Sequence, residues 1–242
     1  MEERITQPLI QVGLLQSLVS GNFTGCITVG ELKQLGDTGI GTFDSIDGEL
    51  ILLDGVVYQA LADGSIAVPP DSAGVTFASV TRFRETAAGL LSPSESLAAL
   101  EQQLYSLLPE KNYFYTVLFR GSFPSVTVRS ETPCESSART LSEVMETAQT
   151  VHTCRNTAGT IVGQYCPAYM EGFQVCGWHF HFLSHDRTLG GHVLALSAGG
   201  GPIRFSESRT LSVHLPRDPL FRGMDLTSDH RRAIEQLERG TP

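Results

Sequence analysis

The sequence predicts a mainly β protein of the α+β class, built from two β-rich parts. Between residues 39 and 64, short apolar runs are separated by three Asp-Gly pairs, which are typical of the tight turns of a β-meander. From residue 159 onward, one strand-like run follows another. Segments with helical spacing are fewer, and they lie before, between and after the strand-rich regions.

Apolar spacing and turn residues define the elements expected in the first part. Residues 9–19 carry apolar side chains at roughly helical spacing and predict a helix, and residues 29–37 suit a short helical turn. The clearest helix covers residues 92–109, where Ser92 can cap it, Glu95 completes a capping box and leucines form one stripe. Strands are expected over the other apolar runs: 39–64 as a meander, 74–83, and 112–130 as two strands joined at Gly121-Ser122.

A short helix at residues 138–149 is expected to bridge the two parts. The second part continues with strands at 159–165, 175–183, 191–197 and 203–215. Residues 228–240 predict a last helix capped by Ser228. We therefore predict two domains, over residues 1–145 and 146–242.

Composition excludes several classes of function. The chain has 242 residues and a formal net charge of −9, with no run of Lys or Arg, so a nucleic-acid partner is not expected. No apolar run approaches the ~20 residues that span a bilayer, so no membrane association is expected. The five cysteines are odd in number and form no CxxC pair, which disfavours a disulfide framework and fits a cytoplasmic location.

The stretch GWHFHFLSHDRTLGGHV, residues 177–193, contains four of the seven histidines. Side chains alternate along a strand, so His179 and His181 share one face, about 6.6 Å apart, while the aromatic residues beside them face a core. The polar residues 184–191 are expected to turn the chain back. If this hairpin pairs His181 with His192, a third imidazole joins the same face. Three neutral nitrogens with open positions are the arrangement of a catalytic zinc site.

Two other interpretations of these histidines stay open. The first is an aromatic sheet in which the three side chains are satisfied separately, without a metal. The second is a cupin-like metal enzyme, which also carries HxH on a barrel strand. In cupins a glutamate usually follows shortly after this motif, but here that position is His185, which we expect in the turn, facing solvent. No G-x-S-x-G motif occurs, so a serine hydrolase is not supported.

Four segments occur in an order that is specific to one family. They are residues 36–64, 108–130, 159–194 and the terminal AIEQLE, 233–238. Together they resemble the α-acetolactate decarboxylases, the enzymes that make acetoin. The chain departs from the family pattern at Trp178, where Tyr is usual, at Cys176, where Pro is common, at Thr38, where Phe is usual, and in residues 130–141, which lack a proline- and tyrosine-rich stretch.

The resemblance implies decarboxylation of 2-acetolactate to (R)-acetoin with Zn²⁺ as cofactor. It implies an N-terminal mixed-sheet domain, a C-terminal small closed antiparallel β-barrel that carries the metal site, a helical tail, and a homodimer formed through the N-terminal domains. The residues that it assigns are the zinc ligands His179, His181 and His192 and the active-site residues Glu49, Arg129 and Glu238. Without the family, each of these last three reads as an ordinary charged residue.

The chemistry of this substrate class requires no organic cofactor. In a β-keto acid the electrons left by departing CO₂ enter the neighbouring carbonyl, and zinc chelated by the substrate hydroxyl and carbonyl oxygens would stabilise the resulting enediolate. Arg129 suits the substrate carboxylate, and Glu49 suits proton transfer. The alternative of a different class is a non-catalytic metal-binding β-barrel for sensing or storage, which would need neither Glu49 nor Arg129.

Overall fold

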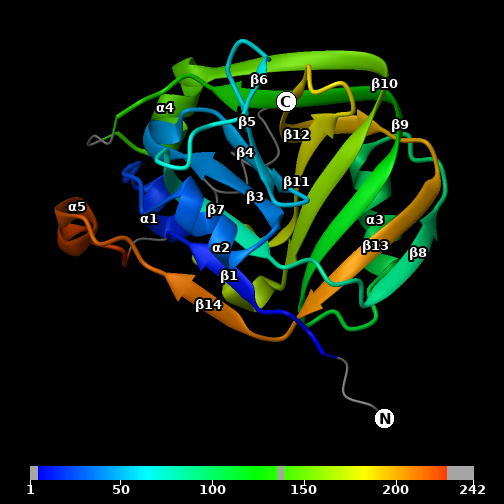
Figure 1. The fold of residues 1–242 in the computed structure, drawn as a ribbon, viewed down its shortest axis with the longest axis horizontal. Helices are drawn as coiled ribbons and strands as arrows, with labels where there is room; N and C mark the ends of the chain where they lie inside the picture. Colours follow the sequence, from blue (N-terminus) through cyan, green and yellow to red (C-terminus); the bar gives the residue numbers. More distant parts are fainter. Residues whose placement is uncertain (1–4, 136–138, 228–242) are drawn as a thin grey trace.

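The computed structural model describes residues 5–135 and 139–227, and two β-sheets dominate this part of the chain (Figure 1). The strands of the first sheet are β1 (Leu9–Val12), β2 (Ile27–Thr28), β3 (Thr38–Phe43), β4 (Glu49–Leu53), β5 (Val56–Ala60), β6 (Ile66–Ala67), β7 (Gly74–Thr81) and β14 (Leu211–His214). Their order is β14-β1-β7-β3-β4-β5-β6, with β2 paired to β7. The β1–β14 pair is parallel and the other pairs are antiparallel, so this sheet is mixed.

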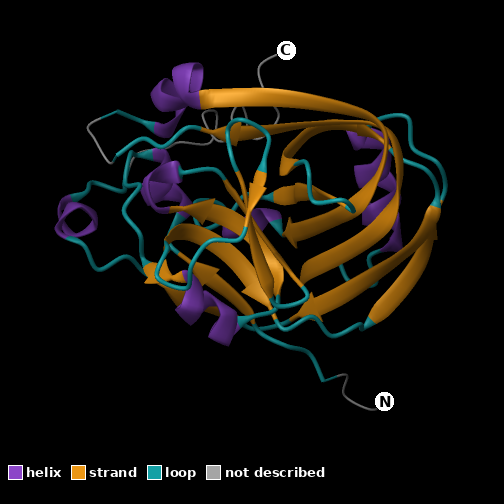
Figure 2. Cartoon of the chain, turned by 45° about the horizontal axis from the view of Figure 1, so that its top comes forward, coloured by secondary structure: helices purple, strands orange, loops and turns teal. Residues whose placement is uncertain are grey.

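The second sheet is antiparallel and has the order β10-β11-β12-β9-β13-β8. Its strands are β8 (Ala87–Leu91), β9 (Phe114–Glu131), β10 (Gln149–Cys166), β11 (Gly177–Ser184), β12 (Gly190–Ser197) and β13 (Gly201–Ser208). The helices are α1 (Leu15–Val19), α2 (Val29–Leu35), α3 (Leu97–Leu107), α4 (Leu141–Ala148) and α5 (Pro219–Gly223), with 3₁₀ turns at Asp44–Ile46 and Ala168–Met170. Figure 2 shows how far strands outweigh helices, which confirms the mainly β prediction.

The strand β9 connects most of the second sheet. It pairs with β10 along almost its whole length, with β12 through its second half and with β13 through its first half. Because β10 also pairs with β11, and β11 with β12, the pairings of these four strands lead back to β9. A closed barrel stays a prediction. So does the domain division at residue 145: β8 and β9 precede that position in this sheet, and β14 follows it in the other sheet.

The helix predicted over residues 9–19 is wrong in its first half. Leu9–Val12 form β1, all four residues are buried, and the strand lies between β7 and β14. Gly13 then adopts a positive φ of 73°, and a Cβ there would lie 2.4 Å from the carbonyl oxygen of Thr76. The chain therefore turns at Gly13 before α1 begins, and the apolar spacing did not reveal this because the β14 partner comes from the far end of the chain.

Three further segments differ from the prediction. The two strands predicted over residues 112–130 are one continuous strand, β9 (Phe114–Glu131), because Gly121 and Ser122 pair with β10 instead of forming a turn. The helix predicted from residue 92 begins at Leu97, and Ser96, not Ser92, caps it by accepting a hydrogen bond from a backbone N–H. The predicted segment 203–215 divides into β13 and β14, which belong to different sheets.

The helices α2 and α4 agree with the predicted segments 29–37 and 138–149. Each begins with a capping box, in which the side chains of Thr28 and Glu31, or of Thr140 and Glu143, satisfy backbone N–H groups reciprocally.

All five cysteines are free thiols. Among the helices of the described residues, none has the length and apolar character that crossing a bilayer requires.

A buried apolar cluster joins the two sheets. It combines side chains of β3 and β4 in the first sheet with side chains of β9, β10 and β11 in the second: Ile40, Ile51, Leu53, Leu118, Val162 and Leu183. Beyond it, the second sheet encloses an aromatic core in which Phe182 packs edge-on against Phe123, with ring centroids 5.1 Å apart. Within this cluster, β4 of the first sheet packs against β11, the strand that carries His179 and His181.

We expect close packing within the first sheet to make Gly39→Ala strongly destabilising. A Cβ on Gly39 would lie 2.2 Å from the carbonyl oxygen of Ser79 and 2.7 Å from Cα of Val80. Both are backbone atoms of β7, so relief requires movement of a paired strand. The free energy of unfolding, measured by urea denaturation, should fall by about 1–3 kcal/mol or more. Gly223→Ala is the control, because an added Cβ there meets nothing within 4 Å. Equal effects of the two variants would contradict this packing.

Candidate metal centre

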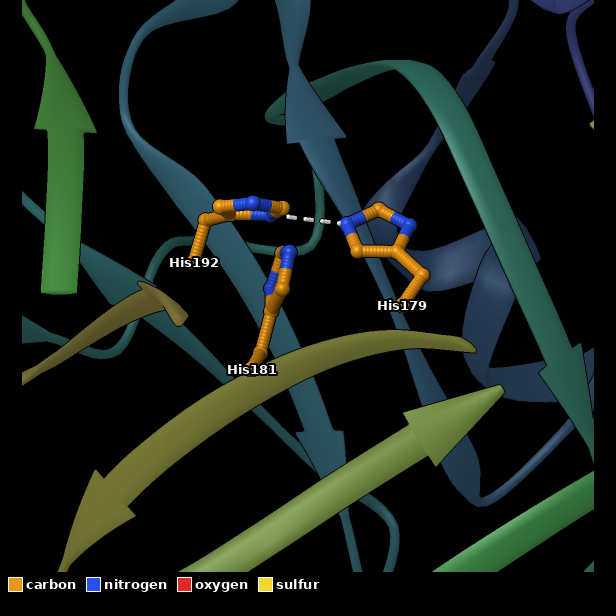
Figure 3. Close-up of side chains that lie close together, drawn as sticks. All are labelled: His179, His181 and His192. Carbon is orange, nitrogen blue, oxygen red and sulfur yellow. Dashed lines mark hydrogen bonds between the residues drawn. The ribbon is translucent and has the colours of Figure 1, made fainter. Parts of the chain in front are cut away.

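The hairpin of β11 and β12 brings three histidines onto one face. His181 lies directly opposite His192, which confirms the predicted register, and His179 lies on the same face two residues before His181. His185 is exposed in the turn between the strands, as expected. In Figure 3 the three imidazole rings converge from the two strands.

The three imidazoles are close enough to share one ion. Ring centroids are 5.0 Å apart for His179 and His181, 4.8 Å for His179 and His192, and 5.7 Å for His181 and His192. One nitrogen from each ring can be chosen so that all three lie within 4.8 Å of one another. His181 and His192 are buried and His179 is partly buried. Among the described residues, this is the one group of three or more potential ligands suited to a metal ion.

The hydrogen bonding of His181 directs one free nitrogen into this group. Its Nδ1 lies 2.9 Å from the carbonyl oxygen of Leu50 in β4. A carbonyl only accepts, so Nδ1 carries the proton and Nε2 carries the lone pair. That Nε2 is buried, makes no hydrogen bond to any described residue, and faces Oε2 of Glu49 at 3.3 Å. A lone pair beside a carboxylate is a favourable place for a cation, so the residues present fit a divalent metal.

The protonation states of the rings also suit metal binding. Burial, followed by the positive charge of Arg129, lowers the pKa of His179 to about 3. Burial, followed by the neighbouring His179, lowers the pKa of His181 well below its usual value. His179 Nε2 and His192 Nδ1 are 2.9 Å apart, which is a hydrogen bond between two rings. Neutral imidazoles at pH 7 offer the lone pairs that a metal needs without first losing a proton.

A cavity of about 60 Å³ lies beside these rings. Glu49, at the start of β4, and Arg129, which pairs in register with His192, both line it, together with His179 and His192. Both charged residues are buried, each with 7% of its surface exposed. The rest of the wall is largely apolar: Leu15, Leu18, Val19, Ile46, Phe77, Leu141, Met145 and Val175. The predicted site residues Glu49 and Arg129 are therefore brought together with the histidines, whereas Glu238 lies outside the described residues.

One further charged residue of this cavity was not among the predicted site residues. Glu131, at the end of β9, has 4% of its surface exposed, and its Oε1 lies 3.4 Å from Nε of Arg129. Two residues apart on one strand, Arg129 and Glu131 share a face, so the alternation rule could have found the pair.

A larger cavity of about 760 Å³ lies between α3 and the strands where β11 and β12 diverge, and it also reaches His179 and His192. It depends on the packing of α3 and left no local signal in the sequence.

Comparisons with known proteins agree on one family. The model of the alpha-acetolactate decarboxylase family matches residues 9–228. The chain is 37% identical to the alpha-acetolactate decarboxylase of Lactococcus lactis subsp. lactis over 92% of this chain and 94% of that protein, and 36% identical to that of Methanosarcina mazei over 96% and 80%.

The solved structures agree as well. The crystal structure of alpha-acetolactate decarboxylase from Bacillus subtilis strain 168 superposes with a TM-score of 0.91 at 29% identity, covering 97% of this chain and 100% of that chain. Both the fold and the sequence thus agree with this family. The chain belongs to the alpha-acetolactate decarboxylase family.

Proposed function

We propose that this protein is an acetolactate decarboxylase, which converts 2-acetolactate to (R)-acetoin and CO₂ with a bound Zn²⁺ ion. The observation that carries the proposal is the close grouping of His179, His181 and His192 beside a cavity that Glu49 and Arg129 also line. Membership of the family supplies the substrate, since the relatives are named for it. A site built only to store or sense a metal would require neither of the two charged residues.

In this proposal His179, His181 and His192 hold the metal. Three imidazoles leave coordination positions open, unlike the closed four-ligand sites that only stabilise structure. When bound, the ion supplies a Lewis acid that stabilises negative charge developing on the substrate oxygens as CO₂ leaves. The hydrogen bond from His181 Nδ1 to Leu50 fixes that ring and its tautomer before any ligand arrives.

Arg129 and Glu49 act on the substrate itself. The guanidinium of Arg129 offers a planar fork of N–H donors, which matches the carboxylate of 2-acetolactate and orients it for departure. Glu49, buried beside His181, carries the proton that replaces CO₂ on the carbon. Delivery of this proton from one side of the cavity would give a single enantiomer of acetoin. The apolar wall suits the methyl groups of the substrate.

The remaining implications of the resemblance belong to the same proposal. Glu238 would bring a carboxylate from the C-terminal tail to the site. The histidines would lie in a closed β-barrel, the protein would form a homodimer through its N-terminal part, and it would act in the cytoplasm. Sedimentation equilibrium of the purified protein tests the dimer, and Glu238→Gln in the same decarboxylation assay tests the tail.

Metal removal is the direct test of the proposed function. Purified protein should contain about one divalent ion per chain. A strong chelator should remove this ion and abolish acetoin formation from 2-acetolactate, and added Zn²⁺ should restore it, because His179, His181 and His192 together supply the protein ligands. Elemental analysis, a colour assay for acetoin and chiral chromatography measure the three quantities.

Two outcomes would contradict this function in different ways. Metal binding without acetoin formation under any metal would favour the storage or sensing alternative. Full turnover in protein shown by elemental analysis to be metal-free would reject the metal-dependent mechanism while leaving the substrate assignment intact.

A further inference from the structure

The strand β9 ends in a buried pair of opposite charges at the wall of the cavity. Arg129 and Glu131 point to the same face of the strand, with Nε and Oε1 separated by 3.4 Å. Ser130 between them points to the other face, where its hydroxyl donates a hydrogen bond to the carbonyl oxygen of Ala60 in β5. The backbone on which both charges stand is thereby tied to the first sheet.

Burial makes this contact more than a surface ion pair. Arg129 has 7% and Glu131 has 4% of its surface exposed. Removing two charges from water is costly, and geometry decides whether their attraction offsets the cost, so such pairs are a poor device for stability alone. A fixed geometry is what they do provide. Because Glu131 and Arg129 both line the cavity, the ion pair lies beside the place where Arg129 would meet a substrate.

We propose that Glu131 is a positioning residue, which holds the guanidinium of Arg129 in the orientation that receives the carboxylate of the substrate. This inference rests on the proposed function. The contact at Nε restrains rotation of the planar group about its last side-chain bond. The Nη edge of a guanidinium in this orientation is the edge that engages a carboxylate through two parallel hydrogen bonds. Glu131 itself acts through Arg129 and does not touch the substrate.

The test is a double-mutant cycle on kcat/KM for 2-acetolactate. Arg129→Lys alone should lower kcat/KM by more than about tenfold, because a flexible ammonium cannot replace the fork. Glu131→Ala alone should lower it by about tenfold. Glu131→Gln, whose amide oxygen can take the place of Oε1 beside Nε, should retain more activity than Glu131→Ala. In the Arg129→Lys background, both changes at Glu131 should have almost no further effect.

The matched control is Glu135→Ala, a few residues further along the same segment, where the side chain is exposed. It should leave kcat/KM unchanged. Zinc content and the midpoint of thermal unfolding are measured for every variant, so that a loss of metal or of fold is recognised. If Glu131→Ala does not fold, the cycle is run with Glu131→Gln instead. This change should lower kcat/KM about threefold when Arg129 is present and should have almost no effect in the Arg129→Lys background.

The possible failures are distinguishable. If the effects of the Glu131 and Arg129 changes on kcat/KM simply multiply in the double variant, Glu131 acts independently of Arg129 and is not its positioning residue. Equal losses for Glu131→Gln and Glu131→Ala would indicate a proton-transfer role instead, and would also overturn the inference. Unchanged kcat/KM in Arg129→Lys would show that Arg129 has no part in the proposed function, and Glu131 would then have no positioning role.

Discussion

His192→Ala is expected to remove metal binding and decarboxylation together. The ring of His192 is buried opposite His181, and its Nδ1 lies 2.9 Å from Nε2 of His179. Alanine leaves two imidazoles, which cannot hold a zinc ion with the affinity of three. Turnover should fall by more than about a hundredfold. Elemental analysis of the purified variant and the rate of acetoin formation measure the two losses.

His185→Ala is the control for this experiment. It removes a histidine from the same hairpin, but its side chain is exposed in the turn, and metal content and rate should stay at the parent values. Circular dichroism and thermal unfolding should show that both variants keep the fold. Parent-like metal content and activity in His192→Ala would reject the site.

Glu49→Gln is expected to lower kcat by about 10²- to 10⁴-fold, the range that a lost proton carrier costs. The amide has nearly the shape of the carboxylate, so packing around this buried position should survive, but it neither gives nor takes a proton readily at neutral pH. The three histidines are untouched, and the metal should stay. Stopped-flow or steady-state rates, with metal content measured on the same sample, report the outcome.

Glu85→Gln provides the comparison for Glu49→Gln. This glutamate is exposed and does not line the cavity, and its change should leave kcat unaltered. A Glu49→Gln variant with the parent kcat would show that Glu49 is not the proton carrier. Loss of the metal in that variant would instead place its carboxylate among the ligands.

The local part of the site could be predicted from sequence because strands alternate faces with a period of two. That rule placed His179 and His181 together, and the polar turn placed His192 opposite them. The same rule would have paired Arg129 with Glu131, had it been applied to the end of that strand.

The position of Glu49 could not be derived in this way. It lies beside His181 because β4 packs against β11, and the two residues are far apart in the sequence. Only the resemblance to a family suggested it. The incorrect helix prediction for residues 9–19 has a related cause. The spacing of Leu9, Ile10 and Val12 is compatible with a helix, but in the structure this segment pairs with β7 and β14, which are distant in the sequence. Pairing between distant segments therefore limits what local patterns reveal.

During synthesis, β1 leaves the ribosome long before its partner β14. Until residues 211–214 emerge, the backbone donors and acceptors on that side of β1 lack the strand that later satisfies them. The histidines at 179–192 likewise appear well after Glu49, so the nascent chain carries a half-built pocket for most of its elongation. A chain that ended after β13 would expose the otherwise buried strand β1 as the edge of the sheet, in place of the more polar and more exposed β14. Synthesis through β14 is therefore what covers the edge of β1.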